Sequence, residues 1–410
     1  MHSFFKVKTA EDIFESLRDI KPLRIEKVHI TNTLNRVLAT DIIAQEDLPG
    51  FNRSTVDGYA LNARDTFGAS EGLPTPLYIR GEVKMGEIPN FTIKRGECCL
   101  MPTGGMLPEG ADSVLMVEYS QVLEDGMVEI TRPVSPLENV IQSDDDLKKG
   151  QVILKKGSLL RPQDLGVLAG LGIIEVDVFT RPKAAIISTG EEVVYIEQTP
   201  KPGQIRDINS YTIGALCNSL GAQPIYLGII RDKFDDLKAL IEKGLHKSDV
   251  VLLSGGSSVG VKDLTLDVFK SFKNTKILAH GVSISPGKPT IIARRGNKTL
   301  WGLPGHPSSA MIIFDVFLRY LLGKLSGLSN LDKFGGRFLE AEIDRNIDSV
   351  SGRDDYIRVK CSRIGERWVA TPILGKSGLI STMVEADGVI KIDMNTEGIY
   401  KGENIRVMLF

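Results

Sequence analysis

Residues 254–260 form a glycine-rich segment, Ser-Gly-Gly-Ser-Ser-Val-Gly, directly after the apolar run 250–253. The glycines let the backbone approach a ligand closely and present N–H groups to an anion. A helix beginning after the segment would add the positive end of its dipole. The segment is not a Walker A loop, because no Gly-Lys-Ser/Thr follows. We interpret it as a phosphate-binding turn, with a tight strand-to-helix turn as the alternative.

Three carboxylates, Glu192, Asp232 and Asp263, stand near segments of this kind. Glu192 and Asp232 each come shortly after an apolar run, and Asp263 follows the glycine-rich segment. Carboxylates repel phosphate unless a cation lies between them, and Mg²⁺ prefers a few carboxylates together with phosphate oxygens. The trio therefore favours a metal-assisted phosphate site. Helix capping is the alternative for an aspartate such as Asp263 considered alone.

Two proline-rich turns follow further along the chain. Residues 285–289, Ser-Pro-Gly-Lys-Pro, hold Lys288 between prolines, where its charge can neutralise a small oxyanion, although an ordinary surface turn is the alternative. Residues 304–307 form the second turn, and Pro307 suits the first position of a helix. His306 in this turn has no evident Asp, Ser or Cys partner, so we expect it to be structural.

The elements that must position these segments alternate between short apolar runs and helical patterns. Strands are expected at residues 184–187, 224–230, 250–253, 291–293 and 299–303. Helices are expected at residues 209–220, with Asn209 and Ser210 as caps, and at residues 234–245, 264–272 and 308–322. This alternation predicts right-handed βαβ units and an open, doubly wound parallel sheet. Ligands bind beyond the carboxyl ends of such strands, so the polar segments should converge at one edge.

The two ends of the chain have different patterns. Thr9 is suited to cap a first helix with an apolar face of Ile13, Leu17 and Ile20, and Pro22 ends it. Residues 73–134 contain short β-type runs separated by Gly and Pro turns. After about residue 327 only strands are expected, as in a small β barrel or sandwich.

Composition sets limits on the class of protein. The chain has 410 residues, which predicts two to four domains, and it is 42% apolar and 25% charged, as in globular proteins. A net charge of −2 gives no overall basic field, so we expect neither a nucleic-acid nor a membrane partner. The four cysteines contain no Cys-x-x-Cys pair, which favours a reducing compartment. With no signal peptide or apolar membrane span expected, a cytoplasmic protein is the simplest interpretation.

Motifs spread over the whole chain resemble one family. They are residues 54–60 (Ser-Thr-Val-Asp-Gly-Tyr-Ala), 102–105 and 107–112, 146–150, 188–192 (Ser-Thr-Gly-Glu-Glu), 203–207, 254–260, 286–289 and 303–307. Each motif alone is weak, but their order and spacing are specific. On these motifs the chain resembles the molybdopterin molybdenumtransferases, the family of MoeA and the gephyrin E domain.

The resemblance implies a multidomain fold of α/β and β parts. It implies an extended linker domain at residues 1–50 and 138–180 and a small β domain at residues 51–137. A central, doubly wound molybdopterin-binding α/β domain would span residues 181–327, and a C-terminal β barrel would span residues 328–410. The composition changes along the chain agree with these boundaries.

The resemblance also implies a reaction. Molybdate would be inserted into the dithiolene of adenylylated molybdopterin with release of AMP, with Mg²⁺ as the cofactor. The family implies a homodimer with the active site between subunits, and molybdopterin adenylyltransferase is the expected upstream partner. The implied catalytic residues are Asp57, Thr103, Asp146, Glu192, Asp232 and Asp263, with Glu192 and Asp263 binding the metal. The implied substrate-binding residues are Thr189, Gly190, Ser254, Gly255, Gly256, Ser258, Gly260, Lys288, Pro304, Pro307 and Arg353.

Some positions depart from the family pattern. Ile141 and Ser285 stand where basic residues are common, which removes two groups for oxyanion binding. Arg353 and Arg358 are the candidates to replace them. Two alternative functions remain: a scaffold module of the gephyrin type, which would need an added partner-binding extension, and an adenylyltransferase-like enzyme, which would resemble the α/β domain alone. A dinucleotide-dependent dehydrogenase is disfavoured because no Gly-x-Gly-x-x-Gly turn follows the first strand.

Overall fold

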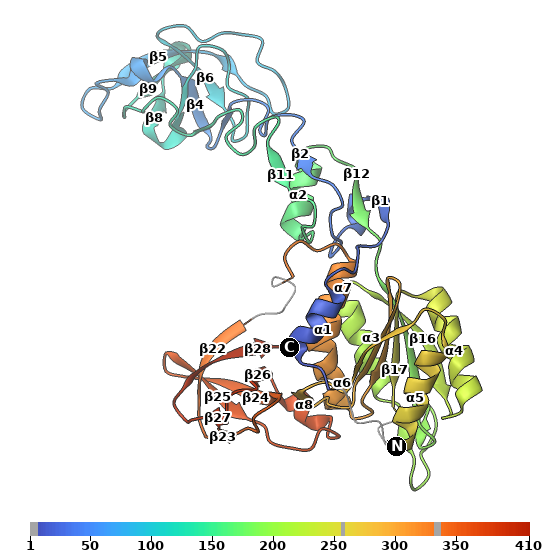
Figure 1. The fold of residues 1–410 in the computed structure, drawn as a ribbon. Coiled ribbons are helices and arrows are strands. Elements are labelled where there is room, and N and C mark those ends of the chain that lie inside the picture. Colours follow the sequence, from blue (N-terminus) through green and yellow to red (C-terminus); the bar gives the residue numbers. More distant parts are fainter. Residues whose placement is uncertain (1–6, 256–258, 332–337) are drawn as a thin grey trace. The chain divides into compact units, whose positions relative to one another are not determined.

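The computed structural model describes residues 7–255, 259–331 and 338–410. They divide into two compact units (Figure 1). Unit 1 comprises Met1–Thr40, Lys156–Arg161 and Glu175–Phe410, and unit 2 comprises Asp41–Lys155 and Pro162–Ile174. No helix of the described residues is long and apolar enough to cross a membrane.

A six-stranded sheet forms the centre of unit 1. Its order is β16 (Gln223–Ile230), β13 (Lys183–Thr189), β17 (Val250–Ser254), β21 (Lys298–Leu303), β20 (Ile291–Arg295) and β18 (Lys276–His280). The first four strands are parallel, as predicted, but β20 and β18 run antiparallel to their neighbours. Only Gly296 and Asn297 separate β20 from β21, and a link this short permits only an antiparallel hairpin. The prediction missed β18.

Helices cover both faces of this sheet (Figure 1). Ala184 and Ile186 of β13 face α1 (Ala10–Leu17), α3 (Asn209–Ser219), α6 (Pro307–Ile313) and α7 (Arg319–Leu325). The alternate residues Ala185 and Ile187 face α4 (Phe234–Lys247) and α5 (Val259–Ser271). Because successive strand residues point to opposite faces, a continuous apolar strand fills two cores at once. The predicted doubly wound α/β domain is confirmed.

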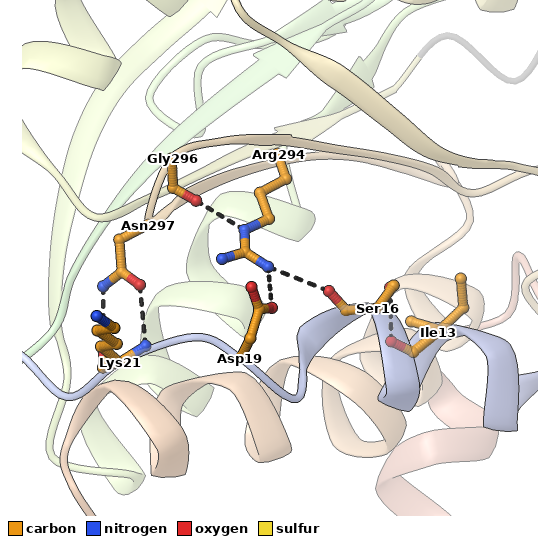
Figure 2. A network of polar contacts seen from close by, with 7 residues as sticks. All are labelled: Ile13, Ser16, Asp19, Lys21, Arg294, Gly296 and Asn297. Carbon is orange, nitrogen blue, oxygen red and sulfur yellow. Dashed lines mark hydrogen bonds and ion pairs between the residues drawn. The ribbon is translucent and has the colours of Figure 1, made fainter.

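Helix α1 is anchored to the sheet by polar contacts at its end (Figure 2). Thr9 caps the helix in a capping box with Asp12, as the sequence predicted. Beyond the helix, the Arg294 guanidinium contacts Asp19 and the Ser16 carbonyl. The Asn297 side chain makes two hydrogen bonds, of 2.9 and 3.0 Å, with the backbone of Lys21. The β20–β21 hairpin thus fixes the N-terminal segment on the α/β domain.

Two predicted helices differ in detail from the structure. Asn209 and Ser210 do not cap α3, because Ser210 donates its backbone N–H to the carboxylate of Asp207 and Asn209 bonds elsewhere. The helix predicted at residues 308–322 is α6 and α7 joined by a π-helical turn, Phe314–Leu318. Pro307 occupies the first turn of α6, as expected.

The C-terminal strands of unit 1 form a closed barrel. The ring is β24 (Asp354–Ile364), β25 (Arg367–Pro372), β22 (Phe338–Ile343), β28 (Asn404–Leu409), β26 (Gly388–Ile392) and back to β24. Val359, Ile390 and Val407 belong to its buried core. The short strand β19 (Ile284–Ser285) pairs in parallel with the start of β24, with Ser285 opposite Asp355. This pairing fixes the 285–289 turn against the barrel.

Unit 2 contains the small β domain. Its sheet runs β7 (Ser113–Met116), β4 (Gly58–Leu61), β6 (Glu97–Met101), β5 (Thr75–Glu82), β9 (Met127–Ile130) and β8 (Ser120–Val122). The prediction missed β4, because the polar residues just before it resemble a loop. Beside this sheet, β2 (Ile42–Ile43) pairs with β11 (Val152–Leu154), and helix α2 spans Pro162–Gly170.

Candidate functional site

A cavity of about 310 Å³ lies at the carboxyl ends of β13, β17 and β21, and we call it the strand-end cavity. It is lined by Ser188, Thr189, Glu192, Val193, Ile205, Arg206, Asp207, Ile208, Asn209, Ser254, Gly255, Gly305, His306, Pro307 and Gly378. Polar segments that follow three of the predicted strands, at residues 188–192, 254–260 and 304–307, therefore meet in one cavity, as predicted. The segment after a further strand reaches the edge of the cavity, since Asp232 bonds to Thr189.

The start of the glycine-rich segment is fixed by its neighbours in the sheet. Gly255 has a φ of +131°, and a Cβ at this position would lie 1.9 Å from the Thr189 carbonyl oxygen. Its N–H points to the Leu303 carbonyl, 3.4 Å away. Only glycine fits between the ends of β13 and β21. The predicted Gly256 and Ser258 lie outside the described residues, as do the side-chain surroundings of Gly260 and Asp263 in α5.

One predicted carboxylate, Glu192, lines the strand-end cavity, and another, Asp232, lies at its edge. The Thr189 hydroxyl donates to Asp232. Burial raises the pKa of Asp232; the Thr189 bond lowers it, and the negative charges of Glu192 and Glu191 raise it further. Glu192 folds over Gly190, where a Cβ would lie 2.8 Å from its Oε2 atom. Carboxylates that disfavour each other's charge provide a suitable environment for a cation.

The donor set fits Mg²⁺ bound together with a phosphate. Among the described residues no group of three or more His, Cys, Asp or Glu is arranged to hold a metal. Mg²⁺ needs only one or two protein carboxylates when phosphate oxygens and water complete its octahedron. Glu192 and Asp232 supply two carboxylates beside the Thr189 hydroxyl. Asp263 is the other predicted ligand, and its side chain lies outside the described residues. The described donor set therefore consists of Glu192, Asp232 and Thr189.

A second cavity, of about 260 Å³, contains a buried arginine, and we call it the Arg358 cavity. It is lined by Ser285, Pro286, Tyr356, Ile357, Arg358, Ile373, Leu374, Gly375 and Ser377. Arg358 is 8% exposed, and its guanidinium donates to Ser308 Oγ (3.0 Å), Thr382 Oγ1 (2.8 Å) and the Gly375 carbonyl (2.7 Å). No carboxylate of the described residues pairs with it, and burial lowers its pKa. A buried cation without a counter-ion is suited to bind an anion.

The other predicted cations lie outside these two cavities. Arg353 pairs with the buried Asp355, at 2.9 Å between Nε and Oδ1, so its charge is already compensated. Lys288 is exposed and lines neither cavity, although Ser285 and Pro286 of the same turn line the Arg358 cavity. Pro304 is buried, and Pro307 lines the strand-end cavity.

A hydrogen bond between His306 and Ser377 lies in the wall between the two cavities. His306 Nδ1 lies 2.8 Å from Ser377 Oγ. His306 lines the strand-end cavity, Ser377 lines the Arg358 cavity, and Gly378 lines the strand-end cavity again. The expectation that His306 has no serine partner was wrong, because that partner lies 71 residues away in the chain. The two cavities are therefore neighbours that share a wall.

In unit 2 the predicted Asp57 and Thr103 form a local pair. Asp57 Oδ1 accepts the Thr103 backbone N–H at 2.7 Å and the Thr103 hydroxyl at 2.8 Å. These bonds hold the pKa of Asp57 below its ordinary value, the backbone N–H having the larger effect. Asp57 is thus kept ionised and oriented on the surface of unit 2. Asp146, also exposed, donates its backbone N–H to the Leu48 carbonyl.

Replacing Thr103 by valine is expected to raise the pKa of Asp57, because valine keeps the backbone N–H but removes the hydroxyl donor. A lowered pKa stabilises the fold above the unfolded-state value, and the effect is lost as the pH falls through the folded-state value. Removal of this bond in Thr103→Val should therefore lower the free energy of unfolding only where Asp57 is ionised. The difference from wild type should disappear in acid, where Asp57 is protonated. Carbon-detected NMR titration of the Asp57 carboxyl measures the pKa. Thr131→Val, which removes a hydroxyl bonded to Tyr119, is the control, and an unchanged pKa in Thr103→Val would contradict the assignment.

Family models match nearly the whole chain. Residues 6–172 match the MoeA N-terminal region (domain I and II), residues 185–324 a probable molybdopterin binding domain, and residues 340–410 the MoeA C-terminal region (domain IV). A Methanocaldococcus jannaschii protein assigned to molybdopterin biosynthesis is 34% identical over 98% of this chain and 97% of its own length. A molybdopterin molybdenumtransferase of Staphylococcus aureus is 30% identical over 93% of this chain and 90% of its own.

Solved structures agree with these matches. The crystal structure of a molybdopterin biosynthesis MoeA protein from Pyrococcus horikoshii OT3 has 31% sequence identity and a TM-score of 0.84, covering 99% of this chain and 100% of its own. Its fold, the convergent motifs and the sequence relatives all indicate the same assignment. The chain belongs to the MoeA family of molybdopterin molybdenumtransferases.

Proposed function

We propose that this chain inserts molybdate into molybdopterin during molybdenum cofactor biosynthesis. Its relatives are named for this transfer and match over most of both chains. The observation that carries the proposal is the buried Arg358, which has no carboxylate partner among the described residues and lines a cavity next to the strand-end cavity. An oxyanion site beside a substrate site is what insertion of an oxyanion requires.

The Arg358 cavity is the proposed molybdate site. Three hydrogen bonds fix the guanidinium, which leaves two of its five N–H donors for an anion. Charge-assisted hydrogen bonds in a partly desolvated pocket are stronger than neutral ones. A cation fixed before the anion arrives needs no reorganisation during the reaction. Lys288, in the same turn as two residues of the lining, is proposed to add positive charge near this cavity, whereas the charge of Arg353 is already compensated by Asp355.

The strand-end cavity is the proposed site of adenylylated molybdopterin. Its phosphate bridge is assigned to the glycine-rich segment and the start of α5, where backbone N–H groups and the helix dipole favour an anion. Glu192, Asp232 and Asp263 are proposed to hold Mg²⁺, which would neutralise the phosphate charge and polarise the bridge. The protein then contributes orientation and charge neutralisation rather than a nucleophilic triad. The His306–Ser377 bond forms part of the wall between the two proposed sites.

The assembly and its setting are also proposals. We propose a homodimer in which Asp57, Thr103 and Asp146 are supplied to each active site by the second subunit. Asp57 is ionised and fixed, as a group that orients a cationic or hydrogen-bond-donating ligand must be. The enzyme would act in the cytoplasm and receive its substrate from a molybdopterin adenylyltransferase. The net charge of −2 gives no reason to expect nucleic acid or a membrane as partner.

The direct test is release of AMP from purified adenylyl-molybdopterin. Protein, Mg²⁺ and substrate are incubated with and without molybdate, and AMP is measured by chromatography. Release that depends on both protein and molybdate is expected. No release, or equal release without molybdate, would reject insertion as the function.

Removal of the metal is expected to stop AMP release. Treatment with EDTA should abolish it, and excess Mg²⁺ should restore it. Glu192→Gln should raise the Mg²⁺ concentration needed for half-maximal release, because one carboxylate ligand is lost. The matched control is Glu191→Gln, which changes an exposed neighbour whose carboxylate lies 4.0 Å from Arg231. Full release in EDTA, or equal shifts in the two variants, would contradict the metal assignment.

A further inference from the structure

Asn209 is a buried amide at the strand-end cavity that the proposed mechanism does not use. It is 6% exposed and lines the cavity from the first turn of α3. Its Nδ2 atom lies 2.6 Å from Ser254 Oγ and 2.9 Å from the Gly305 carbonyl oxygen. It therefore joins the start of the glycine-rich segment to the turn before α6 within the lining of the cavity.

The orientation of this amide is fixed by its partners. The Gly305 carbonyl oxygen can only accept a hydrogen bond, so the atom beside it must be the NH₂ group of Asn209. The Oδ1 atom is left on the other side. It is buried, and no donor of the described residues bonds to it. A buried acceptor without a donor costs free energy, so Oδ1 is set to receive a donor from a bound molecule.

Because Asn209 Oδ1 needs a hydrogen-bond donor, a ligand atom that can only accept hydrogen bonds is excluded at this point of the cavity. A phosphate or molybdate oxygen is an acceptor and would repel Oδ1. Glu192 and Asp207, which line the same cavity, are acceptors too when ionised. Arg206, in the same lining, is a cation that suits an anion elsewhere in the cavity, whereas the unsatisfied acceptor at Asn209 suits the N–H edge of a planar heterocycle. An amino group projects beyond the ring edge, and both the adenine and the pterin of the proposed substrate carry one.

We propose that Asn209 is a specificity residue whose Oδ1 accepts a hydrogen bond from the amino group of the substrate heterocycle. This inference rests on the proposed function, because it assigns a ring of that substrate to the wall formed by Asn209. The phosphate bridge must then lie away from Asn209 Oδ1. Sites that hydrogen-bond a substrate group discriminate strongly against analogues without it.

The test pairs each ligand with an analogue that lacks only the amino group. One arm compares AMP with purine riboside 5′-monophosphate, and the other compares pterin with pteridin-4-one. Binding of each is measured by calorimetry to full-length wild type, Asn209→Ala and the control Asn218→Ala, which changes an exposed residue of the same helix. The arm that shows discrimination identifies which ring contacts Asn209.

Wild type should bind the amino ligand of one pair roughly ten-fold or more tightly than its partner. Asn209→Ala should bind both members equally, and Asn218→Ala should behave as wild type. A purely structural Asn209 would instead weaken both members of a pair by the same factor, which would overturn the proposal. Should Asn209→Ala fail to fold, equal binding of both pairs by wild type alone would overturn it. Wild type that binds neither AMP nor pterin would count against the proposed substrate itself.

Discussion

Replacement of Arg358 by methionine is expected to weaken molybdate binding by roughly 30-fold or more, because truncating a buried charged partner typically costs 2–5 kcal/mol. Arg358 contributes a desolvated positive charge that no carboxylate of the described residues compensates. Methionine has a similar volume and no charge, so the variant removes the attraction for the anion without leaving a large void. The loss should appear in the molybdate concentration needed for half-maximal AMP release and in the Kd measured by calorimetry.

The same substitution should have little effect on stability. Burying an unpaired charge is costly, and replacing such a group by an apolar side chain is often neutral or stabilising. Against this gain stands the loss of three hydrogen bonds to Ser308, Thr382 and Gly375. Molybdate should raise the Tm of wild type but not that of Arg358→Met. Arg367→Ala, which removes an exposed arginine of β25 paired with Glu342, is the control, and equal molybdate affinity in wild type and Arg358→Met would remove Arg358 from the site.

Replacement of Gly58 by alanine is expected to destabilise unit 2 by roughly 3 kcal/mol or more. Gly58 lies in β4 between β6 and β7, and a Cβ there would stand 1.8 Å from the Leu115 carbonyl oxygen. A backbone atom held in a ladder cannot move aside, so the strands must separate. Asp57, next in the chain, would lose its position opposite Thr103.

This loss can be located by spectroscopy. The chain has two tryptophans, Trp301 and Trp368, and both belong to unit 1, so tryptophan fluorescence reports on that unit. In Gly58→Ala, hydrogen exchange of β4, β6 and β7 should accelerate while the tryptophan transition stays unchanged. Gly72→Ala is the matched control, because a Cβ there meets no atom within 4 Å. Equal protection of β4 in the two variants would refute the steric argument.

The parallel strands and their converging ends could be predicted from sequence because the signals are local. Residues 184–187 and 250–253 are uninterrupted apolar runs, and each is followed at once by glycine or hydroxyl groups. The same short pattern therefore predicts both a buried strand and the edge of the sheet at which a ligand binds. The barrel strands were predicted for a related reason, since their apolar residues alternate between turns.

The Arg358 cavity and the role of Asn209 were beyond local reasoning. Arg358 stands in the middle of a strand. Its guanidinium is held in place by the hydroxyl groups of Ser308 and Thr382, which only the fold brings close to it. Asn209 has the residue type of a helix cap, but its amide bonds to Ser254 and Gly305, 45 and 96 residues away. Tertiary contacts took precedence over capping propensity at this position. The His306–Ser377 pair was missed for the same reason.

Molybdate insertion is tested by following molybdenum and AMP in the same reaction. Wild-type protein is incubated with adenylyl-molybdopterin, Mg²⁺ and molybdate, and the molybdenum bound to the dithiolene sulfurs is quantified by X-ray absorption alongside the AMP released. We expect equal amounts of the two, and loss of both in Arg358→Met at low molybdate. AMP released without formation of molybdenum–sulfur bonds would show a hydrolase and would contradict insertion as the activity of this chain.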